Sequence, residues 1–132
     1  MARILIIDDS EEIRRLLRMV LKSAAHEVLE ARDGAEGLKC VDKQKVDLVI
    51  TDVFMPEMDG LEILREMRKT HPGLNVIAMS GGGKYGNMDI MRIARSFGAF
   101  HVIAKPFIIS EVLQIVSAAL AASHPGDEIG DR

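Results

Sequence analysis

Carboxylates stand at the ends of two apolar runs in this sequence. Asp8 and Asp9 follow the run at residues 3–7, and Asp52 follows the run at residues 48–51. Such runs, when bounded by turn residues, are typical of strands in a parallel sheet that is covered on both faces. Sites in open α/β sheets lie at the carboxyl ends of the strands, so we expect the three carboxylates to share one site.

A divalent metal ion is the expected ligand of this acidic cluster. Three carboxylates at one point would repel one another unless a cation joined them. A compact site made only of oxygen atoms prefers a hard ion that keeps some of its waters, which favours Mg2+ over Zn2+. The sequence has no pair of His or Cys residues at a spacing typical of zinc ligands.

Two further polar residues stand at the ends of the remaining apolar runs. Ser80 ends the fourth run, and Lys105 and Pro106 follow the fifth. A carboxylate nucleophile, a metal ion, a hydroxyl and an ammonium around one point suit a phosphoryl group, because its transfer depends on positioning and charge neutralisation. Asp52 is therefore the predicted phosphate acceptor.

The elements that would position these residues alternate between strand and helix. The expected strands are residues 3–7, 27–31, 47–51, 75–80 and 99–104, and the expected helices are residues 11–24, 34–43, 60–70, 88–98 and 110–122. Five such units predict a doubly wound, five-stranded parallel sheet with right-handed crossovers and helices on both faces. The common order, 2-1-3-4-5, is that of the flavodoxin-like α/β folds and places the first and third strands side by side.

Length and composition restrict the class of protein. A chain of 132 residues predicts one domain, residues 1–122, followed by a tail, residues 123–132, that is expected to be disordered. The net charge of −3 provides no basic stripe, so no direct contact with nucleic acid is expected. The single cysteine, Cys40, and the lack of a signal peptide or long apolar span indicate a cytoplasmic protein with no membrane segment.

The motifs at the strand ends together resemble those of the receiver domains of two-component response regulators. The matching stretches are DD at residues 8–9, DVFMPEMDG at 52–60, MSGGG at 79–83 and KPF at 105–107, and the likeness covers residues 3–122. By this resemblance Asp52 accepts a phosphoryl group from a sensor histidine kinase or a histidine phosphotransfer protein. The chain would then be a signalling switch in a phosphorelay and not an enzyme, since it catalyses only its own phosphoryl transfer and slow hydrolysis.

The resemblance implies a ligand set for the metal. Asp9, Asp52 and the backbone carbonyl of Phe54 would hold Mg2+, and Asp8 would assist through a water molecule. Mg2+ is thus the expected cofactor.

The resemblance also implies contacts to the phosphoryl group. Lys105 would pair with it, and Ser80 would bond one of its oxygens. The peptide bond between Lys105 and Pro106 is expected to be cis, which is rare in proteins.

Two departures from the family pattern concern how a signal would leave the site. Val102 stands where many receivers have an aromatic residue, three positions before the lysine. The stretch from Ser80 to Lys105 is a few residues longer than in the family, and the excess falls most naturally in GGGKYGN, residues 81–87. One hypothesis is that a rearrangement of this loop carrying Tyr85 replaces the missing aromatic. The alternative is that Tyr85 is an exposed loop residue with no such role.

Protein binding is the expected output. Apolar residues spread around more of the helix at 110–122 than one buried stripe needs, and Met88 and Met91 lie in the helix before it. We therefore expect the face of the fourth and fifth helices to dock a downstream protein or a second copy of the chain on phosphorylation. In this interpretation the protein is similar to stand-alone chemotaxis or phosphorelay regulators.

Two alternatives stay open on the sequence alone. One is a hydrolase that uses Asp52 as nucleophile, like the dehalogenase-like phosphatases, although Phe54 stands where that family has a second Asp. The other is an interaction module that keeps the fold but is not phosphorylated.

Overall fold

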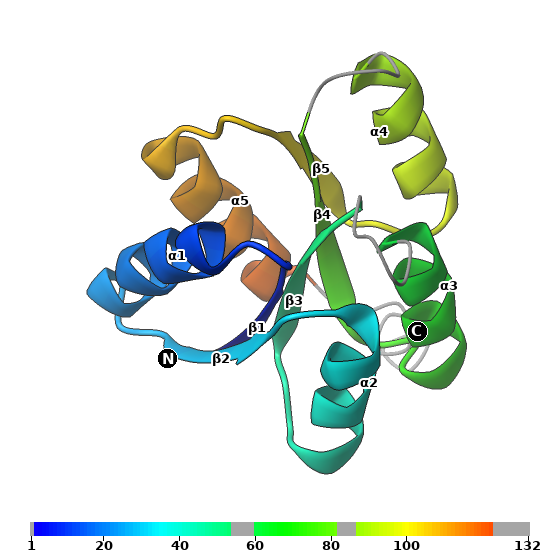
Figure 1. The fold of residues 1–132 in the computed structure, drawn as a ribbon, viewed down its shortest axis with the longest axis horizontal. Helices are drawn as coiled ribbons and strands as arrows, with labels where there is room; N and C mark the ends of the chain where they lie inside the picture. The colour runs from blue at the N-terminus through cyan, green and yellow to red at the C-terminus, as the bar shows by residue number, and fades with distance from the viewer. Residues whose placement is uncertain (1, 54–59, 82–86, 123–132) are drawn as a thin grey trace.

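The five strands form a single parallel sheet in the order β2-β1-β3-β4-β5 (Figure 1). This computed structural model describes residues 2–53, 60–81 and 87–122. The strands are β1 (Arg3–Ile7), β2 (Glu27–Ala31), β3 (Leu48–Asp52), β4 (Asn75–Ser80) and β5 (His101–Ala104). The predicted fold class and strand order are confirmed.

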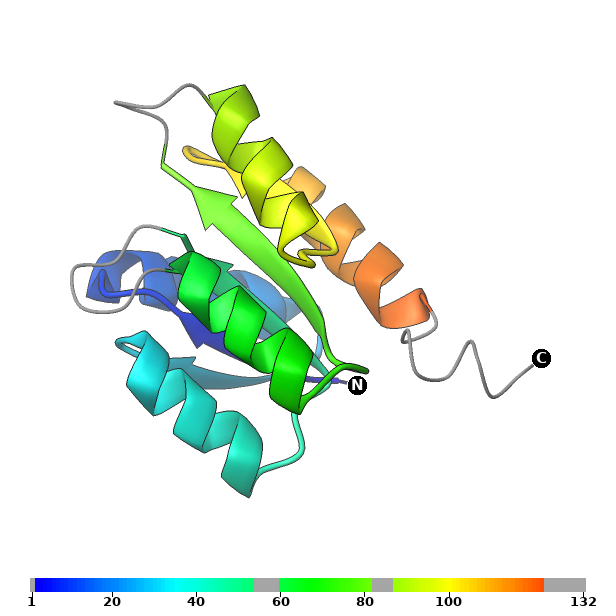
Figure 2. The same cartoon turned by 90° about the vertical axis from the view of Figure 1, so that its right-hand side faces the viewer.

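Helices cover both faces of the sheet (Figures 1 and 2). They are α1 (Glu11–Ser23), α2 (Gly34–Lys43), α3 (Gly60–Thr70), α4 (Asn87–Ser96) and α5 (Ile109–Ala121). α1 and α5 lie on one face, and α2, α3 and α4 lie on the other. Among the described residues, no helix has the length and apolar character needed to cross a membrane.

Two apolar clusters, one on each face, explain the apolar runs of the sequence. Leu5 and Ile7 of β1 pack in the cluster under α2, α3 and α4, whereas Ile4 and Ile6 pack in the cluster under α1 and α5. All four side chains are fully buried. Since successive residues of a strand point to opposite faces, a strand covered on both sides needs apolar residues throughout.

Some element bounds differ from those expected. β3 extends to Asp52, so this carboxylate belongs to the strand end itself. Gly98 closes the fourth helix, as expected: α4 ends at Ser96, and Gly98 follows with a φ of +105°, the left-handed conformation in which glycine ends helices. β5 begins only at His101, although Phe100 in the bend before it already donates its N–H to the carbonyl of Val76 in β4.

Several predictions lie outside the described residues. These are the disordered tail at 123–132, the metal contact of Phe54 and the role of Tyr85.

Candidate functional site

The strand register brings the predicted site residues to one edge of the sheet. Ile7 pairs with Thr51, which places the next residues, Asp8 and Asp52, at the ends of neighbouring strands. Ser80 is the last residue of β4 and pairs with Ala104 of β5. The acidic pair, the predicted phosphate acceptor, the hydroxyl and the lysine thus meet where the strand order reverses.

The acidic cluster comes from two strand ends and one turn. Asp8, Asp9 and Asp52 each offer a carboxylate oxygen, and these oxygens lie within 4.8 Å of one another. Asp8 and Asp52 are buried, while Asp9 is exposed. The set contains only hard oxygen ligands and reaches the surface at Asp9, which fits an ion such as Mg2+ that keeps part of its water shell.

Lys105 joins the two buried carboxylates. Its Nζ lies 3.0 Å from Oδ2 of Asp8 and 3.1 Å from Oδ2 of Asp52. Burial of the ammonium is the largest influence on the pKa of Lys105 and lowers it, but the negative charge of Asp52 and the hydrogen bonds and charge of Asp8 outweigh burial. The pKa of Lys105 is therefore raised above its ordinary value, and the ammonium stays charged at neutral pH.

Ser80 presents a buried hydroxyl at the same edge. Its side chain is 1% exposed, and its Oγ has no hydrogen-bond partner among the described residues. A buried hydroxyl without a partner is destabilising, so such a group is typical of a site that serves a ligand. The backbone here is well fixed, because the N–H of Lys105 donates to the carbonyl of Ser80 at 2.7 Å.

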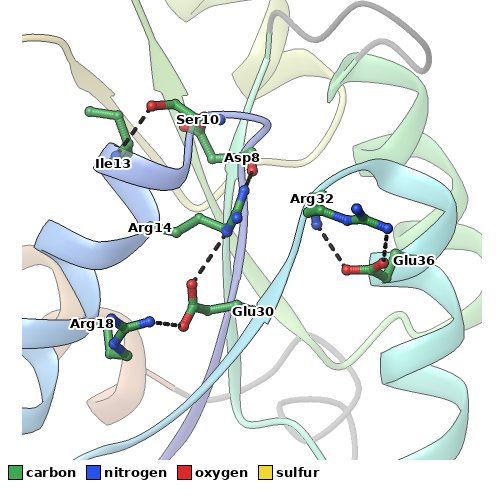
Figure 3. Close-up of polar contacts among 8 residues, drawn as sticks. All are labelled: Asp8, Ser10, Ile13, Arg14, Arg18, Glu30, Arg32 and Glu36. Atoms are coloured by element: carbon green, nitrogen blue, oxygen red, sulfur yellow. Dashed lines mark hydrogen bonds and ion pairs between the residues drawn. The ribbon is translucent and has the colours of Figure 1, made fainter.

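The turn between β1 and α1 presents Asp9. The N–H of Asp8 donates to the carbonyl of Ala31 at 3.1 Å, and the carboxylate of Asp8 accepts from the N–H of Ser10 at 2.9 Å. Ser10 then caps α1, since its Oγ accepts from the N–H of Ile13 at 3.3 Å (Figure 3). The residues on both sides of Asp9 are therefore fixed by hydrogen bonds.

One contact of this turn is absent from the sequence-based predictions. Nη1 of Arg14 donates to the carbonyl oxygen of Asp8 at 2.8 Å, and Glu30 of β2 holds the same guanidinium (Figure 3). Arg14 and Glu30 are 16 residues apart in the sequence, and no periodic pattern pairs a helix residue with a strand residue. The four-residue spacing from the helix cap, Ser10, to Arg14 is the only signal that could have indicated it.

The remaining predicted residues are placed as follows. The peptide bond between Lys105 and Pro106 is cis, the isomer that the resemblance implies. Val102 is buried in the cluster under α2, α3 and α4.

Comparison with known proteins agrees with this geometry. Residues 4–117 match the response regulator receiver domain. The chain belongs to that family. Receiver domains are phosphoacceptor modules of two-component signalling, and histidine kinases and phosphotransfer proteins are their partners.

Three similar proteins show how this receiver domain occurs elsewhere. It is 36% identical over 118 residues to sporulation initiation phosphotransferase F of Bacillus subtilis, with 89% of this chain and 93% of that protein covered. The chain is also 35% identical over 127 residues to the transcriptional regulatory protein GlrR of Escherichia coli. That match covers 96% of this chain but only 28% of the length of GlrR. The crystal structure of the response regulator TrrA from Thermotoga maritima, in complex with Mg2+ and BeF, is 32% identical with a TM-score of 0.80, covering 91% of this chain and all of TrrA.

Proposed function

We propose that the protein is a phosphorylation-dependent signalling switch whose phosphate acceptor is Asp52. The observation that carries this proposal is the bridge from Lys105 to the two buried carboxylates, with the hydroxyl of Ser80, which has no partner among the described residues, at the same edge. An ammonium and a hydroxyl donor beside one carboxylate are the groups that a transferred phosphoryl group requires.

Each side chain has a distinct part in the proposed transfer. An oxygen of Asp52 attacks the phosphorus, the bond from phosphorus to the donor nitrogen of a phosphohistidine breaks, and the freed imidazole nitrogen takes up a proton. Lys105 neutralises one phosphoryl oxygen, and the hydroxyl of Ser80 donates to another.

Asp8, Asp9 and Asp52 form the protein's contribution to the proposed metal site, together with the backbone carbonyl of Phe54. Mg2+ bound there would offset the negative charge that the acceptor and the phosphoryl group share. Asp8 also holds Lys105 through its Oδ2, so it serves the ammonium as well as the metal.

The proposed phosphoryl donor is a sensor histidine kinase or a histidine phosphotransfer protein, and the proposed target binds at α4 and α5. Ile93 of α4 and, after the helix, Phe97 and Phe100 are exposed apolar residues. Leu113 and Ile115 of α5 are half-buried against the core. Phosphorylation-dependent binding of a protein, including a second copy of this chain, would cover this surface.

The compartment that fits this role is the cytoplasm. Cys40 is a free thiol, as is usual where the environment is reducing. Burial raises its pKa, with a further contribution from the charge of Glu36, so the thiol is mostly protonated at neutral pH.

Incubation with acetyl phosphate and Mg2+ tests the assignment by intact-protein mass spectrometry. The wild type should gain one phosphoryl group, and Asp52→Asn should gain none while giving the same circular dichroism spectrum. Rapid release of many equivalents of phosphate would instead indicate the hydrolase. A wild type that takes up no phosphoryl group and does not respond to beryllofluoride would indicate the inert interaction module.

A further inference from the structure

Arg14 connects the acidic site to β2, the outermost strand beside β1. Its side chain is only 11% exposed, which is unusual for an arginine on a surface helix. Nη1 donates to the carbonyl oxygen of Asp8 at 2.8 Å, and Nε donates to Oε1 of Glu30 at 3.3 Å (Figure 3). One guanidinium therefore holds the β1–α1 turn and the edge strand β2 at the same time.

Glu30 pairs with two arginines of α1, of which only Arg14 also contacts Asp8 in the described part of the chain. Its Oε1 accepts from Arg14, and its Oε2 pairs with Arg18. Figure 3 shows Arg14 between Glu30 and Asp8, while Arg18 lies one helical turn further along α1 and is 38% exposed. Arg18 also pairs with Glu30, but among the described residues only Arg14 of the two arginines contacts Asp8, so the two form a matched pair.

The carbonyl that Arg14 binds belongs to the peptide unit between Asp8 and Asp9. A peptide unit is planar, so fixing its oxygen also fixes the direction in which Asp9 leaves Asp8. The other groups of Asp8 are held as well, since its N–H bonds Ala31 and its carboxylate bonds Ser10 and Lys105. Arg14 thus completes the restraint on the one peptide unit that orients the exposed carboxylate.

We propose that Arg14 is a positioning residue for the metal site, and that Glu30 acts on the site through Arg14. By fixing the Asp8–Asp9 peptide, Arg14 keeps the carboxylate of Asp9 within reach of the other two acidic side chains. This inference rests on the proposed function, because it assumes that the acidic cluster binds Mg2+. Arg14 and Glu30 would thus support the metal ligands from outside and extend the site to β2.

Positioning and simple electrostatics predict opposite effects for the loss of Arg14. A guanidinium near a cation site repels the cation, so removing its charge should strengthen Mg2+ binding if charge alone mattered. Removing a group that orients a metal ligand should weaken binding. The direction of the change therefore identifies the role of Arg14.

Mg2+ titration by calorimetry of the full chain, at constant ionic strength, tests the proposal. For Arg14→Met we expect Mg2+ binding to weaken about tenfold or more. Arg18→Met removes the same charge from the same helix and the same partner, but it leaves the contact with Asp8 in place, so its Mg2+ affinity should match the wild type. Equal weakening in both variants, no change in either, or tighter binding by Arg14→Met would overturn the proposal.

Two further measurements keep the test decisive. In the metal-free protein, the amide resonances of Asp9 and Ser10 should shift in Arg14→Met and stay in place in Arg18→Met; unchanged resonances would count against a positioning role, and this comparison needs no metal. If Arg14→Met does not fold, Arg14→Lys replaces it, because one ammonium cannot reproduce both contacts of the guanidinium and should bind Mg2+ more weakly than the wild type. Wild-type affinity in Arg14→Lys would then overturn the proposal. A wild-type protein that binds no Mg2+ would contradict the proposed function itself.

Discussion

The ammonium of Lys105 lies 3.0 Å from the carboxylate of Asp8, although the two residues are 97 positions apart. Their strands are not neighbours, since β3 and β4 lie between β1 and β5 in the sheet. The contact forms because the lysine side chain reaches across the ends of two strands and also meets Asp52 on the way. The salt bridge therefore joins the residue after β1, the first strand, to the residue after β5, the last strand.

Replacing Lys105 by Met should destabilise the metal-free protein. The buried carboxylates of Asp8 and Asp52 would lose the ammonium that both contact, and we expect the free energy of unfolding to fall by about 2 kcal/mol at neutral pH. Mg2+ should restore much of this loss, because a cation again joins the carboxylates. Urea unfolding with and without Mg2+ measures both effects.

Lys39→Met is the control for that experiment. It removes the same charge from an exposed position on α2 and should change the free energy of unfolding by less than about 0.5 kcal/mol. If Lys105→Met were as stable as Lys39→Met, the bridge would contribute nothing to the fold.

The bridge also predicts how stability depends on alkaline pH. The pKa of Lys105 is raised in the folded chain above its ordinary value of 10.5, with burial opposed and outweighed by Asp52 and Asp8. A raised pKa means that the folded state binds the proton more tightly, so the stabilisation is complete below the unfolded pKa and is lost as the pH rises through the folded one. The difference in unfolding free energy between the wild type and Lys105→Met should therefore be constant from neutral pH to about pH 10 and shrink above it. A difference that stays constant to higher pH would contradict this account.

The sequence predicts the sheet well because local patterns and topology rules determine it. Apolar runs identify the strands, and the rule that parallel strands end at one edge brings Asp52, Ser80 and Lys105 together. The start of β5 is less predictable, because Phe100 just before it already bonds the distant Val76 of β4 while the strand itself begins at His101. The contact of Arg14 with Asp8 depends on side-chain reach and burial, which the four-residue spacing from Ser10 to Arg14 hints at but does not determine.

A side chain at Gly37 would require Ile7 to shift, because α2 lies close to β1 at this position. A Cβ at Gly37 would stand 2.4 Å from Cδ1 of Ile7, and Ile7 is fully buried, so it has no free space to move into. Gly37→Ala should therefore lower the free energy of unfolding by about 1–3 kcal/mol. Ile7→Val removes the closest atom, Cδ1, and leaves only the Cγ1 contact at 2.9 Å, so the double variant should lose less stability than the sum of the two single variants. Strict additivity in urea unfolding would show that this close contact is not the cause.

Ser80→Ala should separate stability from function at the site. The variant removes a buried hydroxyl that has no partner among the described residues, so the metal-free protein should be as stable as the wild type or more stable by up to about 1 kcal/mol. Ser96→Ala is the contrasting control, because its Oγ donates to the carbonyl of Ile93 at 2.8 Å and its loss should not stabilise the protein.

The same Ser80→Ala variant should bind the phosphoryl analogue beryllofluoride more weakly. In the proposed site the hydroxyl donates to the charged group, and a hydrogen bond of this kind contributes about 1.5–3 kcal/mol, equivalent to roughly 10- to 100-fold in affinity. Titration with beryllofluoride in the presence of Mg2+ measures this loss, with Ser96→Ala expected to bind as the wild type does. A Ser80→Ala protein that binds beryllofluoride normally would show that the buried hydroxyl does not serve the phosphoryl group.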